Sequence, residues 1–503
     1  MRRVPGPSRS GRRECKGRKL PRSSALVILL GALTLSCNRP AEPVGVVLIV
    51  VDALRADHLG CYGYDRPTSS HIDALAADST RFANAVSHSP WTLPSLATLM
   101  TSFYPSVHGA VTSSDIWKWL GDREHFQPVN VVDASRTTLA EVLKANGFST
   151  AAFVNGSYPS KVFGFGQGFD HFVDNDPVMK GIRFNIESLL DWLDRVRPER
   201  FFIYLHTAEV HAPYVPLEED KRYREDGDDP RVRYVAHAIE EERARFSGFN
   251  FDPEYRGTFD GSWFGMRWLE KSPRPVPDAE VRHLGALYDR GVAYTDLWVG
   301  KLLEGLKQRG LYDHSVLIVT ADHGDELLDH GGLELGNTFY EDMMHVPLIL
   351  RAPGEGHGMV VDSQVGLIDV FPTVLDLVGV RTDVPTQGRS VRTLLSGGSL
   401  PDRPAFGEAS FIPGIAALRT NKWKFIYHGN TGGEDLYDLE ADRRETVNLC
   451  ASEKPRCSRF RDQLLQWEAG MREAKVRLGL PRASEAAIDQ ETAARLRALG
   501  YTH

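Results

Sequence analysis

Four continuous apolar stretches stand out along the chain, and each predicts a buried β-strand. They span residues 45–51, 149–154, 201–206 and 315–322. Runs of this length that are rich in β-branched residues and lack polar alternation are typical of strands covered on both faces of a parallel sheet. A further apolar stretch at residues 365–378 is expected to belong to the same core.

Between these stretches, apolar residues recur with the period of amphipathic helices. The helical patterns cover residues 70–84, 138–146, 185–196 and 284–309. Strands that alternate with helices indicate an α/β fold. We therefore expect a large mixed, mostly parallel sheet that is sandwiched by helices.

Two regions depart from this alternation. Residues 217–282 are rich in charge, glycine and proline, and we interpret them as an insertion over the active edge of the sheet. From about residue 388 the pattern changes to short strands and turns, followed by a helix at 457–477. The expected organisation is a catalytic domain at 45–387 and a small α+β subdomain with a helical tail at 388–503.

The first 36 residues have the pattern of a secretory signal peptide. Nine basic residues precede an apolar run at 25–35, which is too short for a bilayer span of about 20 residues. The run ends before Cys37 in a sequence similar to a bacterial lipobox. Lipidation of Cys37, with residues 37–44 as a tether, predicts an exported periplasmic or outer-membrane lipoprotein that meets the membrane only through this anchor. The alternative is a cytosolic protein with a misassigned start and a basic tail.

Composition narrows the class of protein further. The 503 residues are 42% hydrophobic and 25% charged, near the globular average, which excludes wholesale disorder and collagen-like repeats. The net charge of −8 becomes more negative once the basic signal segment is set aside. Nucleic-acid binding needs a basic surface and is not expected. Cys450 and Cys457 could form a disulfide in an oxidising compartment or remain free thiols.

Three polar side chains lie at the ends of predicted strands. They are Asp52, His206 and Asp322. Ligands of open α/β sheets bind beyond the carboxyl ends of the strands, so these side chains are expected at one edge. Asp322 and the adjacent His323 could both reach one divalent cation, with Asp52 completing the site. Taken singly, an aspartate after a strand is more often a helix cap, and Asp-His-Gly is a common turn.

A hydroxyl group is the candidate nucleophile. Thr92 precedes a predicted short helix at residues 94–100. A bound metal lowers the pKa of water to about 7 in the zinc case, and the same effect would activate a threonine hydroxyl for covalent catalysis. Free amides at the helix start would stabilise a tetrahedral oxyanion. The simpler interpretation is that Thr92 only caps the helix.

Taken together, these segments make the chain similar to the sulfatase family of the alkaline-phosphatase-like superfamily. The similarity extends from residue 46 to about residue 449. It rests on residues 50–57, 91–95, 101–109, 205–214, 321–331, 340–347, 368–375 and 436–439. The resemblance implies the same α/β fold and a metal-dependent hydrolase of sulfate esters or of phosphate monoesters or diesters.

The resemblance also implies roles for individual residues. Asp52, Asp322 and His323 would hold one divalent metal ion, and Thr92 would be both the nucleophile and a further ligand. His211 would bind the substrate or protonate the leaving group, since the pKa of histidine lies near 6.5. For His211 the alternative is packing in its segment.

The expected substrate is an anionic ester on a glycan, a lipid or a small molecule. His206 and Ser95 are further candidates for contacts to it. The sequence leaves the metal open among Mn, Zn, Ca and Mg, although carboxylate, imidazole and hydroxyl ligands suit Mn or Zn better than Ca.

The chain departs from the family pattern at several positions. Sulfatases carry Cys or Ser at the nucleophile for oxidation to formylglycine, and Thr92 is not a substrate for that conversion, so no formylglycine is expected. Leu96 replaces an arginine and Ala53 replaces a second aspartate. Leu335 or Gly336 stands where a lysine or histidine is usual. Threonine nucleophiles occur in related phosphodiesterases, phosphonate hydrolases and phosphoethanolamine transferases, which leaves sulfuryl and phosphoryl chemistry both open.

Two other functions stay open at this point. One is a transferase of the same fold that passes a phosphoryl or phosphoethanolamine group to a lipid or glycan, although such transferases usually carry several transmembrane helices and none is visible here. The other is a catalytically degenerate binding protein, which the loss of cationic side chains motivates.

Overall fold

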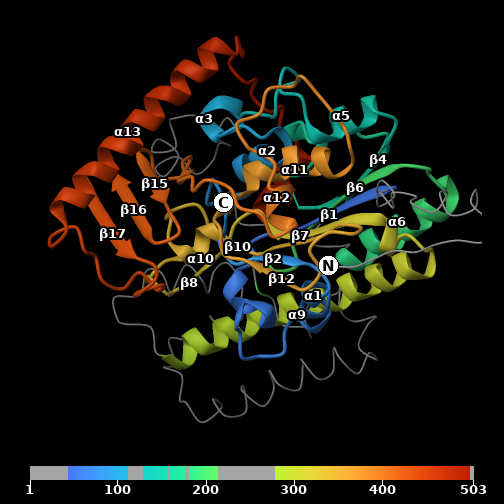
Figure 1. Ribbon diagram of the computed structural model, residues 1–503, viewed down its shortest axis with the longest axis horizontal. Helices are drawn as coiled ribbons and strands as arrows, with labels where there is room; N and C mark the ends of the chain where they lie inside the picture. Colours follow the sequence, from blue (N-terminus) through green and yellow to red (C-terminus); the bar gives the residue numbers. More distant parts are fainter. Residues whose placement is uncertain are drawn as a thin grey trace, which may run out of the picture. The chain divides into compact units, whose positions relative to one another are not determined.

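The computed structural model describes residues 44–111, 129–156, 158–175, 181–212, 214 and 278–498. An eight-stranded sheet forms the centre of this part (Figure 1), with the strand order β12-β2-β11-β7-β1-β6-β4-β5. The strands are β1 (Gly45–Val51), β2 (Thr80–Phe82), β4 (Ser149–Asn155), β5 (His171–Asn175), β6 (Phe201–Thr207), β7 (Ser315–Ala321), β11 (Leu348–Arg351) and β12 (Met359–Val361).

Five neighbouring strands, β7, β1, β6, β4 and β5, run parallel. Strand β11 is antiparallel to both β7 and β2. The predicted mixed, mostly parallel sheet is therefore confirmed. All four apolar stretches form strands of this sheet, and every residue of β1, β6 and β7 is buried, which explains why they lack polar alternation.

The register of the central strands aligns the ends that carry the candidate chemistry. Val51 of β1 pairs with Thr207 of β6 and with Ala321 of β7. The next residues on β1 and β7, Asp52 and Asp322, therefore leave the sheet at the same level. His206 lies beside Val50, one position before that level.

Helices cover both faces of the sheet (Figure 1). One face carries α1 (Ser70–Ala77), α6 (Ile182–Val196) and α9 (Asp278–Gln308), and the other carries α2 (Thr92–Thr101), α5 (Leu139–Ala145) and α11 (Val370–Leu377). Helix α5 begins with a capping box, in which the Thr138 hydroxyl accepts the Glu141 N–H and the Glu141 carboxylate accepts the Thr138 N–H. Such reciprocal bonds satisfy amides that have no partner within the helix.

Several predicted helix boundaries were wrong, and three of them matter for the sheet, the insertion and the site. The helix expected at 70–84 ends at Ala77, because residues 80–82 form β2 between β11 and β12. Helix α9 begins at Asp278, so the end of the expected insertion belongs to it. Helix α2 begins at Thr92 rather than after it.

The C-terminal part contains a second, antiparallel sheet. Its strands are β14 (Ala405–Gly407), β15 (Ile415–Arg419), β16 (Trp423–His428) and β17 (Gly433–Asp438), and helix α13 (Lys454–Arg477) packs against them. The expected α+β character of this part is confirmed. Two small sheets complete the fold, one of β10 (His345–Val346), β3 (Ala85–Val86) and β13 (Val365–Gly366), and one of β8 (Glu326–Leu327) and β9 (Leu333–Glu334).

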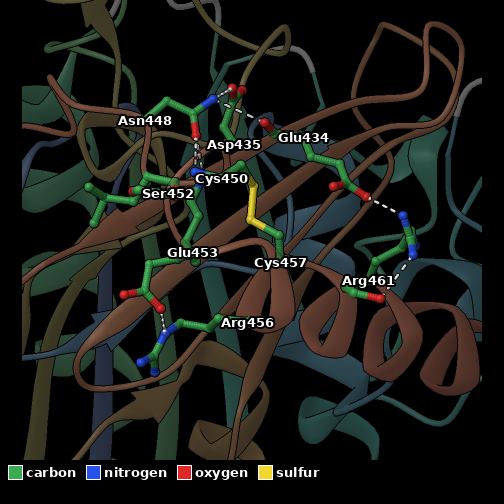
Figure 2. The surroundings of a disulfide bond; sticks show 12 residues. Glu434, Asp435, Asn448, Cys450, Ser452, Glu453, Arg456, Cys457 and Arg461 are labelled. Atoms are coloured by element: carbon green, nitrogen blue, oxygen red, sulfur yellow. Dashed lines mark hydrogen bonds and ion pairs between the residues drawn. A yellow bond between two sulfur atoms is a disulfide. The ribbon is translucent and has the colours of Figure 1, made fainter.

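A disulfide joins Cys450 to Cys457 at the start of α13 (Figure 2). The two Cα atoms are 5.6 Å apart. Beside it, Arg461 pairs with Glu434 of β17 at 2.8 Å, which ties the helix to the sheet. The sequence had left this pairing open between a disulfide and two thiols.

Several expectations fall on residues outside the described part. The signal peptide at 1–36, Cys37 and most of the insertion at 217–282 lie there. Within the described residues, no helix combines the length and apolarity that a membrane span requires.

Candidate active site

The side chains expected at the sheet edge do converge. One ligand atom each of Asp52, His206 and Asp322 lies within 4.8 Å of the other two. All three residues are buried, with at most 2% of their surface exposed. Their strands β1, β6 and β7 are neighbours in the sheet, so residues more than 250 positions apart in the chain meet through strand pairing alone.

The protein orients the carboxylate of Asp322 through one of its two oxygens. Oδ1 accepts hydrogen bonds from the backbone N–H of Ala53 at 3.2 Å and of His323 at 2.9 Å. Among the described residues, Oδ2 has no hydrogen-bond partner although it is buried. A buried polar atom without a partner is costly, and this one is placed to bind a cation.

His323 points its second ring nitrogen at the same place. Nδ1 lies 2.6 Å from the backbone oxygen of Gly324; because a carbonyl only accepts, Nδ1 carries the proton. Nε2 lies 3.2 Å from Thr92 Oγ1, 3.4 Å from Asp52 Oδ1 and 3.6 Å from Asp322 Oδ2. Metal-binding histidines almost always donate their other N–H in this way.

His206 repeats the pattern from the neighbouring strand. Its Nδ1 donates to the backbone oxygen of Asn155 at 2.8 Å. Its Nε2 lies 3.7 Å from Asp52 Oδ2 and makes no hydrogen bond with any described residue. A ring nitrogen that faces a carboxylate at this distance is placed to share a cation with it.

Thr92 is the first residue of α2 and lies within the same cluster. Its hydroxyl oxygen is 3.4 Å from Asp52 Oδ1, and the residue is 1% exposed. The preceding Trp91 is extended, with φ −154° and ψ 162°, so the helix starts abruptly at Thr92. The first four amides of a helix have no intrahelical partner and attract anions.

The buried charged groups strongly shift one another's pKa values. Burial raises the pKa of Asp52, but His211, His323 and His206 outweigh it and lower the pKa to about 2. Burial and the neighbouring Asp52 raise the pKa of Asp322 to about 6. Burial lowers the pKa of His323, but Asp322 and Asp52 outweigh it and raise the pKa to about 9. Without a metal, protons balance the two carboxylates, and a divalent cation would take their place.

The donor set fits a divalent metal ion. Carboxylate oxygens, neutral imidazole nitrogens and an alcohol oxygen are ligands of Zn and Mn, and with fewer nitrogens also of Mg and Ca. This fit rests on Asp322 Oδ2 and His206 Nε2, which are buried and make no hydrogen bond with any residue that the structure describes.

His211 stands near the rim of this cluster. Its Nδ1 donates to the backbone oxygen of Ala212 at 2.6 Å, which directs Nε2 away from that carbonyl. Its charge acts on both Asp52 and Asp325. The residue therefore lies on the side of the site at which Asp325 is found.

Asp325 is a site residue to which the sequence had assigned no role. Tyr214 donates a short hydrogen bond to Asp325 Oδ2, and Oδ1 is buried with no hydrogen-bond partner among the described residues. Burial raises the pKa of Asp325 to about 6. Its position three residues after a buried strand was the signal that could have indicated it.

Ser95 faces the protein. Its hydroxyl donates to the backbone oxygen of Asp322 at 2.5 Å and contacts the Ser87 hydroxyl at 3.0 Å. The residue is fully buried. In the structure Ser95 joins α2 to the loop of Asp322, and a substrate contact for it stays a prediction.

Comparison with known proteins identifies the family. The model of the family described as "Sulfatase" matches residues 45–380. The chain belongs to the sulfatase family. A second model, "N-sulphoglucosamine sulphohydrolase, C-terminal", matches residues 331–469. Membership confirms the expected class of enzyme, a sulfuric or phosphoric ester hydrolase.

Individual sulfatase-like proteins resemble the chain over most of its length. An arylsulfatase of Clostridium perfringens is 24% identical over 81% of this chain and 90% of its own. The crystal structure of the phosphonate monoester hydrolase of Agrobacterium radiobacter covers 86% of this chain and 96% of its own, with a TM-score of 0.63 and 20% identity. A structure described as a complex with its substrate D-glucosamine-2-N,6-O-disulfate covers 87% and 98%, with a TM-score of 0.59 and 18% identity.

The structure explains one departure from the sulfatase pattern. Gly336 has a φ of 91°, a conformation that side chains rarely adopt, and a Cβ there would lie 2.1 Å from the ring of Phe411. Phe411 belongs to the segment that follows β14, and its N–H donates to the Gly336 oxygen at 2.6 Å. An aromatic ring of the C-terminal part thus occupies the space in which a cationic side chain at 336 would begin.

Proposed function

We propose that this sulfatase is a metal-dependent hydrolase that cleaves anionic esters with Thr92 as its nucleophile. The observation that carries the proposal is the convergence of Thr92 Oγ1, His323 Nε2 and Asp52 Oδ1, which lie 3.2–3.4 Å from one another. Asp52, Thr92, Asp322 and His323 would hold one divalent ion. His206, expected only to contact substrate, is placed to be a further ligand.

When bound, the cation supplies Lewis acidity, which lowers the pKa of the Thr92 hydroxyl and neutralises charge on the transferred group. Thr92 Oγ1 then loses its proton to solvent and forms a bond to the sulfur or phosphorus atom, and the bond from that atom to the leaving oxygen breaks. His211, protonated on Nε2, gives its proton to that oxygen, which leaves as an alcohol. Water attacks the sulfur or phosphorus next, and Thr92 departs with a proton restored to Oγ1.

The charges around the site favour esters with one negative charge on the transferred group. Leu96 stands where the family carries an arginine, and Leu335 or Gly336 stands where it carries a lysine or histidine. Asp325 adds a third buried carboxylate to Asp52 and Asp322. Sulfate monoesters, phosphonate monoesters and phosphodiesters carry one charge there, whereas phosphate monoesters carry two near neutral pH. The similarity to an arylsulfatase and to a phosphonate monoester hydrolase agrees with this choice. A sulfated glycan is the natural form of substrate that the disulfate complex suggests.

A panel of aryl esters tests the proposal. Aryl sulfate, phosphate monoester, phosphodiester and phosphonate monoester are each assayed with Mn²⁺, Zn²⁺, Ca²⁺ or Mg²⁺ added to the metal-free protein. We expect turnover of a singly charged ester, and Thr92→Ala should lower it by about 10³-fold or more. Thr101→Ala is the matched control, because Thr101 is buried in the same helix and, within the described part of the chain, its hydroxyl bonds only to the Ala97 oxygen.

Three results would reject this function. Turnover that survives in Thr92→Ala would remove the nucleophile assignment. A bound metal without turnover of any ester would favour the binding protein, and transfer of the group to a lipid or glycan acceptor in place of water would favour the transferase. Intact-mass measurement of the purified chain should show Thr92 unmodified, as expected if no formylglycine forms.

We also propose export and lipidation at Cys37, which rest on the basic start, the short apolar run and the lipobox-like sequence. Expression in a bacterial host should yield a mature chain that begins at Cys37 and carries a diacylglycerol mass. Cys37→Ala should abolish the lipid and leave the enzyme's activity unchanged. An unprocessed chain in the cytosol would support the alternative of a misassigned start.

A further inference from the structure

The turn that follows β1 has an unfavourable backbone conformation. Ala53, directly after the candidate ligand Asp52, has a φ of 61°. This left-handed region costs a residue with a Cβ atom free energy relative to the ordinary regions, and such residues persist only where surrounding contacts hold them. The turn is also fully buried at Ala53, so every polar atom in it needs a partner within the protein.

One side chain supplies two of those partners. The hydroxyl of Tyr288, on helix α9, donates to the backbone oxygen of Ala53 at 2.7 Å and accepts the N–H of Arg55 at 2.8 Å. Tyr288 therefore bridges the two sides of the turn from a helix that lies against the sheet. Without Tyr288, the Ala53 oxygen and the Arg55 N–H would stay buried and would lose these hydrogen bonds.

The remaining polar atoms connect the turn to the site itself. The N–H of Asp52 donates to the Thr207 oxygen at 2.8 Å, and the N–H of Ala53 donates to Asp322 Oδ1 at 3.2 Å. That second bond is one of the two that orient the Asp322 carboxylate. A shift of the turn would therefore move Asp52 directly and break one of the two hydrogen bonds that orient the Asp322 carboxylate.

The ring of Tyr288 is held as firmly as its hydroxyl. His58 packs edge-on against it with centroids 4.7 Å apart, and Tyr214 does so at 5.8 Å. Tyr214 in turn donates to Asp325. The residue is completely buried, so the position of its hydroxyl is set by packing, and removal of the oxygen alone would leave that packing in place.

We propose that Tyr288 is a positioning residue of the metal site: its hydroxyl holds the left-handed turn at Ala53 so that the carboxylates of Asp52 and Asp322 face one cation. This inference rests on the proposed metal-dependent function. Tyr288 does not touch the cation or the substrate, and it acts through the backbone of the turn.

The test is the affinity of the full-length, metal-free protein for Mn²⁺ alone, measured by isothermal titration calorimetry. Tyr288→Phe deletes one oxygen and keeps the ring. Tyr62→Phe is the matched control: the Tyr62 hydroxyl donates to the Phe82 oxygen at 3.0 Å and accepts the Leu348 N–H at 2.9 Å, on strands β2 and β11, which carry no candidate ligand. Thermal unfolding of both variants measures the general cost of losing such a pair of bonds.

We expect Tyr288→Phe to weaken Mn²⁺ binding by about tenfold or more, the range found for groups that orient metal ligands, and Tyr62→Phe to stay within about twofold of the parent. If Tyr288→Phe lowers the unfolding temperature below the assay temperature, all three proteins are titrated in the cold. An affinity of Tyr288→Phe within twofold of the parent, or an equal loss in both variants, would overturn the inference. A parent protein that binds no Mn²⁺, Zn²⁺, Ca²⁺ or Mg²⁺ would instead overturn the proposed function.

Discussion

Two buried clusters of charged side chains differ in how their charges are balanced. At the sheet edge, Asp52, Asp322 and the histidines around them leave buried oxygen and nitrogen atoms without a hydrogen bond from any described residue. Between α10 (Glu341–Met344) and the C-terminal sheet, Glu341 accepts two bonds from Arg419, each of 2.7 Å, and one from Lys424 at 3.0 Å.

This difference indicates that one cluster stabilises the fold and that the other binds a metal ion. In the Glu341 cluster, Arg419 and Lys424 are counterions that pair directly with Glu341, and these pairs join the C-terminal sheet to the α/β part. The sheet-edge cluster has two adjacent carboxylates and orphaned donor atoms, so a charge from outside completes it. Changes in the first cluster should affect the free energy of unfolding, and changes in the second should affect metal binding and turnover.

Asp322→Asn is the strongest test of the sheet edge. The amide oxygen can still accept the two backbone N–H groups, but the charge that binds the cation is gone. We expect Mn²⁺ affinity and turnover to fall by at least about 100-fold, beyond the usual effect of groups that only orient metal ligands. The metal-free variant should unfold at the same or a higher temperature, because a like-charge pair with Asp52 is removed. A metal-free variant that is clearly less stable than the parent would make Asp322 a structural residue.

Arg419→Met tests the second cluster from the other direction. It leaves the buried Glu341 with only Lys424, and breaking a buried pair costs about 3–5 kcal/mol of unfolding free energy. Denaturant titration should show that loss, with metal affinity unchanged. Arg309→Met, which removes an ion pair with the exposed Asp194, is the control and should leave the unfolding free energy nearly unchanged. Equal losses in both variants would contradict the structural role.

The disulfide in the C-terminal part offers a further test of the distinction between fold stability and turnover. Replacement of Cys450 and Cys457 by serine opens a short loop at the start of α13. The expected cost is about 2–3 kcal/mol of unfolding free energy, from the greater freedom of the unfolded chain. We expect kcat to stay unchanged, since the disulfide belongs to the start of α13 and Thr92 begins α2. A drop in kcat at full folding would show that this region shapes the site.

Acid unfolding provides the smallest and most specific signal. Burial opposes ionisation of Glu341, but Arg419 and Lys424 outweigh it and hold its pKa well below the usual 4.5. Its contribution to stability is therefore complete above about pH 4.5 and is lost as the pH falls through the folded-state pKa. Below pH 4.5, Glu341→Gln should lose stability less steeply than the parent, by up to about 1.4 kcal/mol per pH unit. Equal slopes would mean that Glu341 is not ionised in the fold.

The sequence predicted best those elements whose structure depends on a single local property, such as apolar composition. Strands β1 and β7 are continuous apolar runs, and burial on both faces follows from that composition alone. By contrast, β2 has only three residues and lies within a helical period. It becomes a strand because β11 and β12 offer hydrogen bonds on both sides, and those partners come from more than 260 residues further along the chain.

The candidate site divides in the same way. Asp52, Asp322, His323 and Thr92 carry their chemistry in short motifs, and the structure brings all four together. His206 looked like a substrate contact until the register placed it beside β1. Asp325 had been given no role, and only the fold shows that its Oδ1 is buried without a hydrogen-bond partner in the described part of the chain.

By itself, the sequence determined the α/β class, the central strands and the family-like motifs, because apolar runs and adjacent ligand residues are local properties. Tertiary structure alone decided which histidine faces which carboxylate, that an aromatic ring fills the space beside Gly336, and that Tyr288 reaches the left-handed turn at Ala53. These contacts depend on strand register and helix placement, and a tyrosine in a helical period predicts only a core residue. The physical reason is that the position of a single polar atom is set by partners that the chain brings together only when it folds.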